Sequence, residues 1–359
     1  MKVIFLLFLV IINNTLFCQS VELKNKKLIE YYTLINQAEN SIVNQDLKKA
    51  DSLYNSAFNS TENPPAKDLY NNMIVLLKMK KYEGAYKYYE TLKCFQYNFD
   101  ENFLETNFPK SIKFNKNSCK LKLNITFKNE LDSLFEKDQY YRNLSKGNYL
   151  DYKKELTEGD SIVSVGLLKL IKEKGFPNEY DLGLKSANKS FFHNFYFIIW
   201  HQLKSNLYSS QKVNFSPEIN EALNAGKITP ENAAFLLDLI NGENQYTSKH
   251  FSIIQFVTNN GSNTPIYKQV IDKTANVDCC YVTYAFFPEK RNEPINKMIL
   301  AINNQRKKIG LSLIDDDLKK KIFSLDHKEY IFPEAIIEGM NFETKSDSES
   351  FKNLMFKIK

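Results

Sequence analysis

A repeat of 35 residues near the N-terminus constrains the fold of this 359-residue chain more than any other feature. Ala50 and Tyr54 recur as Ala85 and Tyr89 in segments of similar helical pattern, and each segment follows another helical stretch. A small alanine at a helix crossing, with a tyrosine one turn later, allows two helices to pack closely. The repeat therefore predicts two helix–turn–helix pairs over residues 25–96.

These two units resemble tetratricopeptide repeats, whose period is ~34 residues. Pro64 and Pro65 break the chain between the two pairs. Only two units are visible and neither carries the full consensus, so an ordinary four-helix bundle is the alternative. The resemblance implies a surface for a protein or peptide partner.

The composition favours long helices in the rest of the chain as well. Glycine and proline are scarce, with 11 and 10 residues, which disfavours an all-β fold with many turns. The formal charge of +6 comes from lysine and acidic residues that are mixed along the chain. Since no basic cluster interleaves with aromatic residues, we expect no nucleic-acid partner.

The first twenty residues predict export. Met1 and Lys2 precede an unbroken apolar run, Val3–Ile12, which is followed by a short polar stretch and a cleavage region. Ten apolar residues at ~1.5 Å each cover only about half of the hydrocarbon core of a membrane. We therefore predict a signal peptide over residues 1–19 and a periplasmic or secreted protein of the cell envelope. No later segment is long and apolar enough to predict a transmembrane segment.

Cysteines add one alternative for the mature N-terminus and several for disulfides. A lipid anchor on Cys18 needs a small residue before it, and Phe17 occupies that position, so simple cleavage is favoured. The spacing of the cysteines beyond the cleavage region matches no zinc site, and we expect the two adjacent ones not to pair with each other. In all, the four cysteines Cys94, Cys119, Cys279 and Cys280 allow three disulfide pairings, one of which contains the adjacent pair.

Beyond the repeats, the pattern predicts a connector and a larger helical domain. The connector covers residues 97–128, with one short hairpin where residues 121–127 alternate. The helical domain covers residues 129–323, with a minor β element at residues 280–287, and a tail of short β-like pieces and polar runs follows at 324–359. Helices are expected at 129–144, 160–174, 186–207, 216–225, 230–241 and 295–309, and from residue 315. The predicted fold class is mostly α.

One ordered series of polar residues and turns is spread over residues 131–313. They are Asp138, Gln139 and Arg142, then Asp160, the turn Gly175-Phe176-Pro177, Gly183, His201, Asp238, and the ending Arg306, Gly310 and Leu311. In the order and spacing of these residues the chain resembles the family called domain of unknown function 6624. The resemblance implies a helical fold and a pocket, and it implies no reaction.

Two positions depart from the pattern of that family. Asp238 is followed by Leu239 where the family usually has arginine, and only Gln245 and Tyr246 remain of a Tyr-Gly-x-Gln turn. The departures leave open whether the pocket is active or degenerate in this chain.

Asp138 is the most informative single residue. Leu131, Leu134 and Phe135 mark the buried face of its helix, and this face also includes position 138. A buried carboxylate needs a partner, and Arg142 lies one turn later. One interpretation is a structural ion pair that fixes the packing of two helices. The other is a polar pocket wall, to which Gln139 also contributes.

His201 is the second candidate. It lies on an aromatic helix, and His193 is eight residues, or about 12 Å, before it, too far for both to bind one metal ion directly. The chain has no HExxH motif and only four histidines, so we expect no metal site and no cofactor. His201 is then either a core residue or a general base beside Asp138, Asp160 or Asp238. For Asp160, a helix N-cap is the alternative.

Two functions follow from these residues. The leading interpretation is an exported binding or scaffold protein with a polar pocket in its helical domain. The alternative is a hydrolase that uses His201 with Asp138, Asp160 or Asp238, with or without one metal ion. An enzyme requires the histidine and a carboxylate within hydrogen-bonding distance beside an open cavity. The candidate catalytic residues are His201 and Asp138, and the candidate binding residues are Gln139, Arg142, Asp160, Asp238, Gln245 and Tyr246.

Overall fold

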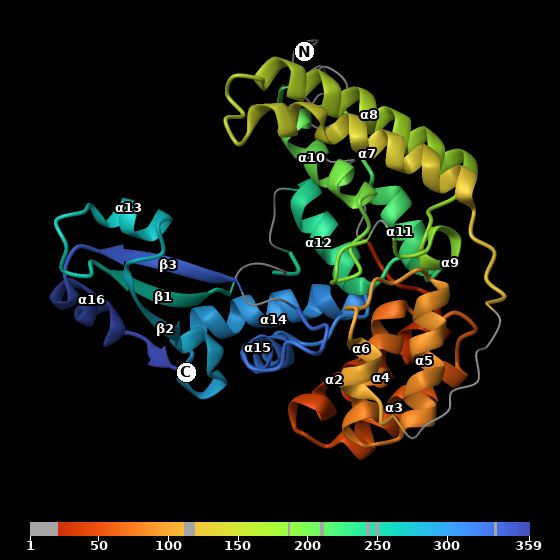
Figure 1. Ribbon diagram of the computed structural model, residues 1–359, viewed down its shortest axis with the longest axis horizontal. Helices are drawn as coiled ribbons and strands as arrows, with labels where there is room; N and C mark the ends of the chain where they lie inside the picture. Colours follow the sequence, from red (N-terminus) through yellow and green to blue (C-terminus); the bar gives the residue numbers. More distant parts are fainter. Residues whose placement is uncertain are drawn as a thin grey trace, which may run out of the picture.

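The computed structural model describes most of the chain beyond the predicted signal peptide. The described residues are 21–110, 119–185, 187–208, 212–241, 245–247, 251–333 and 336–359. The predicted signal peptide and Cys18 lie outside them. The fold is mostly helical with one small four-stranded sheet, which confirms the predicted class (Figure 1). No helix within these ranges has the length and apolar character needed to cross a membrane.

The N-terminal region forms two helical hairpins. The first hairpin pairs α2 with α3 and the second pairs α4 with α5, and α3 packs against α4. Proline precedes the second hairpin, at the N-cap of α4. The helices are α2 (Lys26–Val43), α3 (Leu47–Asn59), α4 (Ala66–Lys78) and α5 (Tyr82–Cys94).

The 35-residue repeat of the sequence is also a repeat of the structure. Gln45 and Lys80, at equivalent positions, both adopt the left-handed conformation with φ of 60° in the turns between paired helices. Ala50 and Ala85 are both completely buried, as a close helix crossing requires. The two hairpins are therefore built on one plan, and their assignment to the tetratricopeptide family stays a prediction.

The connector contains a helix where the sequence predicts a hairpin. After α6 (Phe103–Asn107), α7 (Ile125–Ser145) begins where residues 121–127 are expected to be a strand. The Asn124 side chain accepts a hydrogen bond of 3.0 Å from the Phe127 backbone N–H and caps this helix, so the expected strand is wrong. A disulfide between Cys94 and Cys119 ties the connector to the end of α5.

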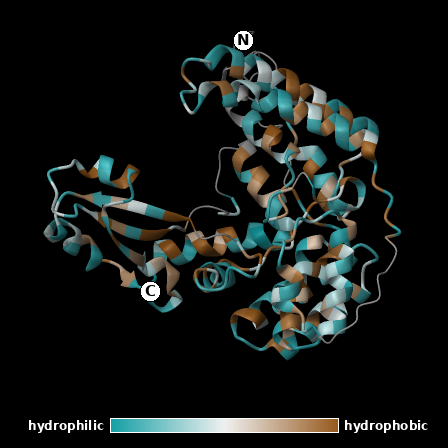
Figure 2. Cartoon of the chain, viewed as in Figure 1, coloured by the Kyte–Doolittle hydropathy of each residue, from teal (hydrophilic) through white to brown (hydrophobic). Residues whose placement is uncertain are grey.

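The larger helical region is built around α10. This helix packs against α7, α8 and α12, and Figure 1 shows the two long helices α7 and α8 side by side at the edge of the molecule. Hydrophobic and hydrophilic residues alternate along these two helices, as expected where one face is buried (Figure 2). The further helices are α8 (Lys153–Lys174), α9 (Glu179–Leu182), α10 (Phe195–Tyr208), α11 (Ser216–Asn224) and α12 (Pro230–Asn241).

The helices α8 and α10 do not begin at the residues that the sequence predicts. Because α8 begins at Lys153, Asp160 lies inside the helix and is not its N-cap. The predicted start of α10 near residue 186 is also wrong, since the helix begins at Phe195. The Asn188 side chain accepts hydrogen bonds from the backbone N–H groups of Ser190 and Phe192, which holds this segment in a turn.

The C-terminal part forms a mixed sheet of order β3-β1-β2-β4. β1 pairs with β2 antiparallel and with β3 parallel. The predicted strand at 280–287 is wrong in its bounds, because β2 ends at Val282 and two short 3₁₀ helices follow. The predicted tail is also part of this sheet and supplies two of its strands. The strands are β1 (Ile253–Thr258), β2 (Asn276–Val282), β3 (Ile337–Phe342) and β4 (Phe356–Lys357), with α13 (Ile266–Ile271) and α16 (Lys345–Lys352) beside them.

The sheet has its own hydrophobic core. Ile253 and Val282 of the sheet pack with Ile299 of α14 (Glu293–Lys308) and Leu318 of α15 (Ile314–Phe323). In Figure 1, α14 runs from the helical region to the sheet. These two helices therefore join the sheet to the rest of the molecule.

Cys279 and Cys280 form a disulfide with each other, contrary to the expectation from the sequence. The peptide bond between them is cis, and their Cα atoms lie 3.1 Å apart. Both residues belong to β2, and Cys280 is buried in the core beneath the sheet.

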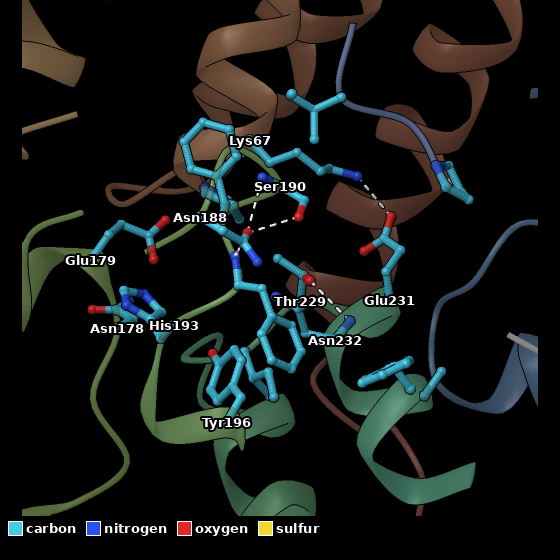
Figure 3. Close-up of a pocket in the computed structure, with 18 of the residues that line it drawn as sticks. Lys67, Asn178, Glu179, Asn188, Ser190, His193, Tyr196, Thr229, Glu231 and Asn232 are labelled. Atoms are coloured by element: carbon cyan, nitrogen blue, oxygen red, sulfur yellow. Dashed lines mark hydrogen bonds and ion pairs between the residues drawn. The ribbon is translucent and has the colours of Figure 1, made fainter. Parts of the chain in front are cut away.

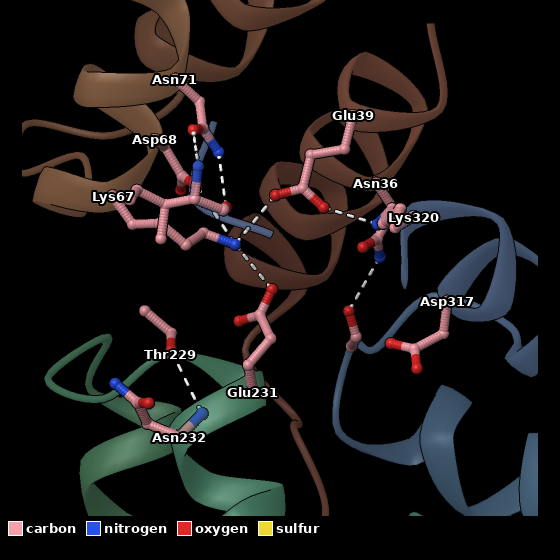
Figure 4. Close-up of polar contacts among 12 residues, drawn as sticks. Asn36, Glu39, Lys67, Asp68, Asn71, Thr229, Glu231, Asn232, Asp317 and Lys320 are labelled. Atoms are coloured by element: carbon pink, nitrogen blue, oxygen red, sulfur yellow. Dashed lines mark hydrogen bonds and ion pairs between the residues drawn. The ribbon is translucent and has the colours of Figure 1, made fainter. Parts of the chain in front are cut away.

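A buried network of charges joins the three parts of the molecule (Figure 4). The Lys67 ammonium on α4 lies 2.9 Å from a carboxylate oxygen of Glu39 on α2 and 2.7 Å from one of Glu231 on α12. The other Glu39 oxygen accepts a hydrogen bond from Lys320 on α15. The network thus connects both hairpins, the larger helical region and the C-terminal helices.

Asp68 lies beside this network and has an unusual pKa. One carboxylate oxygen accepts a hydrogen bond of 2.7 Å from the Tyr31 hydroxyl, and the other lies 3.7 Å from the Lys67 ammonium. Burial raises the pKa of Asp68 to about 7, and the negative charges of Glu39 and Glu231 add to the rise while Lys67 opposes it. The fold therefore favours the protonated carboxyl. This contribution to stability is complete below about pH 4 and is lost as the pH rises through 7.

Replacing Asp68 should change how stability depends on pH. Asp68→Asn keeps an oxygen acceptor for the Tyr31 hydroxyl and does not ionise. The free energy of unfolding of the variant should therefore rise relative to that of the wild type between about pH 4 and pH 8, by a few kcal/mol at ~1.4 kcal/mol per pKa unit. Urea unfolding at several pH values measures this, with Asp100→Asn as a control at an exposed carboxylate. A difference in the free energy of unfolding between Asp68→Asn and the wild type that does not change with pH contradicts the account.

Candidate functional site

A cavity of about 610 Å³ lies where α7, α8 and α10 meet. Each helix contributes polar residues to its wall, and α10 adds two aromatic rings. The lining residues are Phe135, Gln139, Arg142, Asn143, Tyr149, Leu150, Lys153, Leu156, Thr157, Asp160, Phe197, Trp200 and His201. Four of the residues that the sequence singles out therefore line one cavity.

His201 and Asp138 form the centre of this site. The Nδ1 atom of His201 lies 2.9 and 2.8 Å from the two carboxylate oxygens of Asp138. Asp138 is 3% exposed, whereas the His201 side chain keeps 21% of its surface exposed. Since a carboxylate only accepts hydrogen bonds, Nδ1 carries the ring proton and donates a hydrogen bond to Asp138. The Nε2 atom of His201 forms no hydrogen bond with any residue that the structure describes.

Arg142 holds the second carboxylate. Its Nη1 and Nη2 atoms donate hydrogen bonds of 2.7 and 2.8 Å to the two oxygens of Asp160. Nη1 also donates to the Asp138 backbone carbonyl at 2.6 Å and lies 3.4 Å from a carboxylate oxygen of Asp138. The sequence suggests Asp138 as the partner of Arg142, but the shorter contacts with a carboxylate are those with Asp160. This bidentate pair fixes α7 against α8.

The two carboxylates differ in their surroundings. Asp138 accepts a further hydrogen bond of 2.7 Å from the Gln139 side chain. Burial raises the pKa of Asp160, although the hydrogen bonds and the charge of Arg142 oppose the rise. Asp138 is thus the carboxylate that holds the histidine, and Asp160 is the one that holds the arginine.

The arrangement of His201 and Asp138 can move a proton. A carboxylate that accepts the Nδ1–H fixes the tautomer of the ring, so that Nε2 has a free electron pair. It also stabilises the imidazolium ion that forms when Nε2 takes up a proton. In the described parts of the chain, no three His, Cys, Asp or Glu side chains are grouped so that they could hold a metal ion.

Three predicted binding residues lie elsewhere. Asp238 on α12 accepts a hydrogen bond of 3.0 Å from the backbone N–H of Tyr246. The Tyr246 carbonyl in turn accepts a hydrogen bond of 2.8 Å from Arg306, which is buried. Gln245, Tyr246 and Asp238 are not among the residues that line the His201 cavity. Asp238 and Tyr246 instead connect α12 with α14.

Sequence reasoning missed part of the cavity wall. Lys153 and Thr157 lie seven and three residues before Asp160, on the same face of α8. This spacing is a helical signal, but it becomes visible only when the helix begins at Lys153. Phe197 and Trp200 of α10 also line the cavity, and neither is among the site residues that the sequence predicts.

Comparisons of the chain with protein families, curated proteins and solved structures found no match. The resemblance to domain of unknown function 6624 therefore stays a prediction, and the site is interpreted from its own geometry.

Removing the arginine should destabilise the protein. Arg142→Met leaves two buried carboxylates, Asp138 and Asp160, without their shared cation, at a cost of about 3–5 kcal/mol in the free energy of unfolding. Lys174→Met is the matched control, because Lys174 forms a partly exposed ion pair with Glu130 that is worth about 1 kcal/mol or less.

Denaturant unfolding of both variants measures the difference. The double variant Arg142→Met/Asp160→Asn should recover part of the loss, since it removes one of the two charges. If Arg142→Met and Lys174→Met lower the free energy of unfolding equally, the assigned role of the arginine is contradicted.

Proposed function

We propose that the protein is a hydrolase in which His201 is the general base and Asp138 orients it. One observation carries the proposal: the His201 Nδ1 atom is 2.8 Å from Asp138 Oδ2, while His201 lines a cavity of about 610 Å³. A histidine that only stabilises the core has no need of a cavity beside it. This favours an enzyme over the binding or scaffold protein that the sequence suggests first.

In the proposed reaction, water is the nucleophile. The Nε2 atom of His201 takes a proton from the water molecule while the water oxygen attacks the carbonyl carbon of an ester. Asp138 stabilises the imidazolium ion. When the intermediate collapses, His201 returns the proton to the leaving alcohol oxygen, so the products are a carboxylic acid and an alcohol and the enzyme is unchanged.

The walls favour an uncharged substrate with a ring. With a neutral imidazole, the charges of Asp138, Asp160, Arg142 and Lys153 cancel, so the cavity has no excess positive charge for a phosphate dianion. Phe135, Phe197 and Trp200 offer aromatic surface at which a ring can pack. Carboxylic esters of ring-containing acids or alcohols fit both conditions.

We also propose that this reaction takes place outside the cytoplasm. The predicted signal peptide at residues 1–19 is the main support. Two disulfides, Cys94–Cys119 and Cys279–Cys280, support it as well, because disulfides persist in oxidising compartments. The hairpins of α2 to α5 remain a candidate surface for a protein or peptide partner there.

Hydrolysis of aryl esters tests the proposal. The purified protein should hydrolyse 4-nitrophenyl acetate or 4-nitrophenyl phenylacetate, and His201→Asn should lower kcat by roughly 10²–10⁴-fold. Asp138→Asn should lower kcat as well, because the wrong tautomer of the ring becomes accessible. His327→Asn is the control, since His327 packs on Phe323 and pairs with Glu329. Ester hydrolysis that is absent, or that His201→Asn leaves unchanged, refutes the proposal.

A further inference from the structure

A second cavity lies at the junction of the N-terminal hairpins, the larger helical region and the C-terminal part. Its volume is about 390 Å³. Its wall includes Pro65 and Lys67 of the second hairpin, His193 and Tyr196 near the start of α10, and Phe332 of the C-terminal part. We call it the junction cavity (Figure 3). It is independent of the proposed hydrolase reaction.

The polar end of the junction cavity contains two side chains without a hydrogen-bond partner among the described residues. His193 is 3% exposed, yet its ring forms no hydrogen bond with any residue in the described part of the chain. The Tyr196 hydroxyl is likewise without a hydrogen-bond partner among the described residues, and its ring is buried against the His193 ring, with centroids 5.6 Å apart. Buried polar groups usually find a partner in the protein, in water or in a ligand.

Both groups are uncharged at neutral pH. Burial lowers the pKa of His193 to about 4, so the ring is a neutral imidazole with one donor and one acceptor. Burial raises the pKa of the Tyr196 hydroxyl well above its ordinary value. Together they can bind a group that both donates and accepts a hydrogen bond, such as a hydroxyl.

The charged groups of this cavity already have partners. Glu179 accepts a hydrogen bond of 2.6 Å from the Ala66 backbone N–H. Lys67 and Glu231, which Figure 3 shows across the pocket from His193, form an ion pair of 2.7 Å. A charged ligand would leave its own charge unpaired here, and burying such a charge is costly.

Most of the remaining wall is apolar and aromatic. It includes Phe192 and Phe235, whose rings are 5.5 Å apart in a T-shaped contact, together with Leu311, Ile331 and Phe332. A mostly apolar cavity of this size with a few convergent polar groups is typical of small-molecule sites.

We propose that the junction cavity binds a small uncharged alcohol, whose hydroxyl bonds to His193 and Tyr196 and whose aryl or alkyl body packs against Phe192, Phe235 and Phe332. The chemistry of the ligand follows from the paired charges, the neutral polar end and the apolar wall. The site is separate from the hydrolase site, so either proposal can fail without the other.

Trp200 provides a direct signal for binding. It is the single tryptophan of the chain, and it lines both the junction cavity and the His201 cavity. Its ring also packs against Phe235, with centroids 5.5 Å apart. A ligand in either cavity should change its fluorescence, and variants at the two histidines distinguish the cavities.

The probe is 4-phenylbutan-1-ol, with butylbenzene as the matched molecule that lacks the hydroxyl. We expect a saturable change in Trp200 emission with the alcohol and a Kd at least tenfold weaker for butylbenzene. His193→Phe, which keeps a buried ring, and Tyr196→Phe, which removes only the hydroxyl, should each weaken binding of the alcohol about fivefold or more. His201→Asn should leave the Kd unchanged.

Three results overturn the proposal: no saturable change in the wild type, equal affinity for both probes, or loss of binding in His201→Asn with none in the other two variants. The last result assigns the probe to the His201 cavity. Circular dichroism of each variant confirms that it is folded, and Tyr196→Phe keeps the test valid if His193→Phe does not fold.

Discussion

The ion-pair network around Lys67 is the interaction on which the arrangement of the molecule depends. Glu39 lies between Lys67 and Lys320, and Lys67 lies between Glu39 and Glu231, so that each of these four charges has a partner. Buried charges are tolerated only in such paired geometry, because each one left alone costs several kcal/mol. The network therefore stabilises the observed arrangement of the hairpins, α12 and α15, and its members Lys67 and Glu231 line the junction cavity.

Both cavities derive their shape from this arrangement. Glu231 lies in the first turn of α12, and α12 packs against α10. His193 lies two residues before the start of α10, and His201 lies within that helix. Phe197 and Trp200 on α10 face both cavities. A single helix thus separates a neutral, mostly apolar site from one that contains two carboxylates, an arginine and a histidine.

The helices could be predicted from the sequence where local punctuation is strong. Pro217 and Gly226 bound α11, and Pro230 begins α12, because proline fits the first turn of a helix and glycine fits its end. The sheet could not be predicted in the same way. β1 pairs in parallel with β3, which lies about eighty residues later, and short apolar runs carry no information on such distant pairing.

The same contrast applies to the sites. Asp138, Arg142 and His201 could be found because each interrupts an apolar helix face, and the structure brings them together. The role of Asp160 could not, since it depends on where α8 begins. Glu39, Lys67 and Lys320 gave no signal either, because charges on amphipathic helices look the same in a sequence whether they meet solvent or one another.

The tautomer of His201 tests the central claim most directly. Nitrogen-15 NMR of protein labelled at histidine distinguishes a ring protonated at Nδ1 from one protonated at Nε2, and His201→Asn identifies the signals. The account predicts that the neutral His201 ring carries its proton on Nδ1, and that this preference is lost in Asp138→Asn. A neutral His201 protonated at Nε2 in the wild type contradicts it, because the nitrogen assigned to accept the proton would already be occupied.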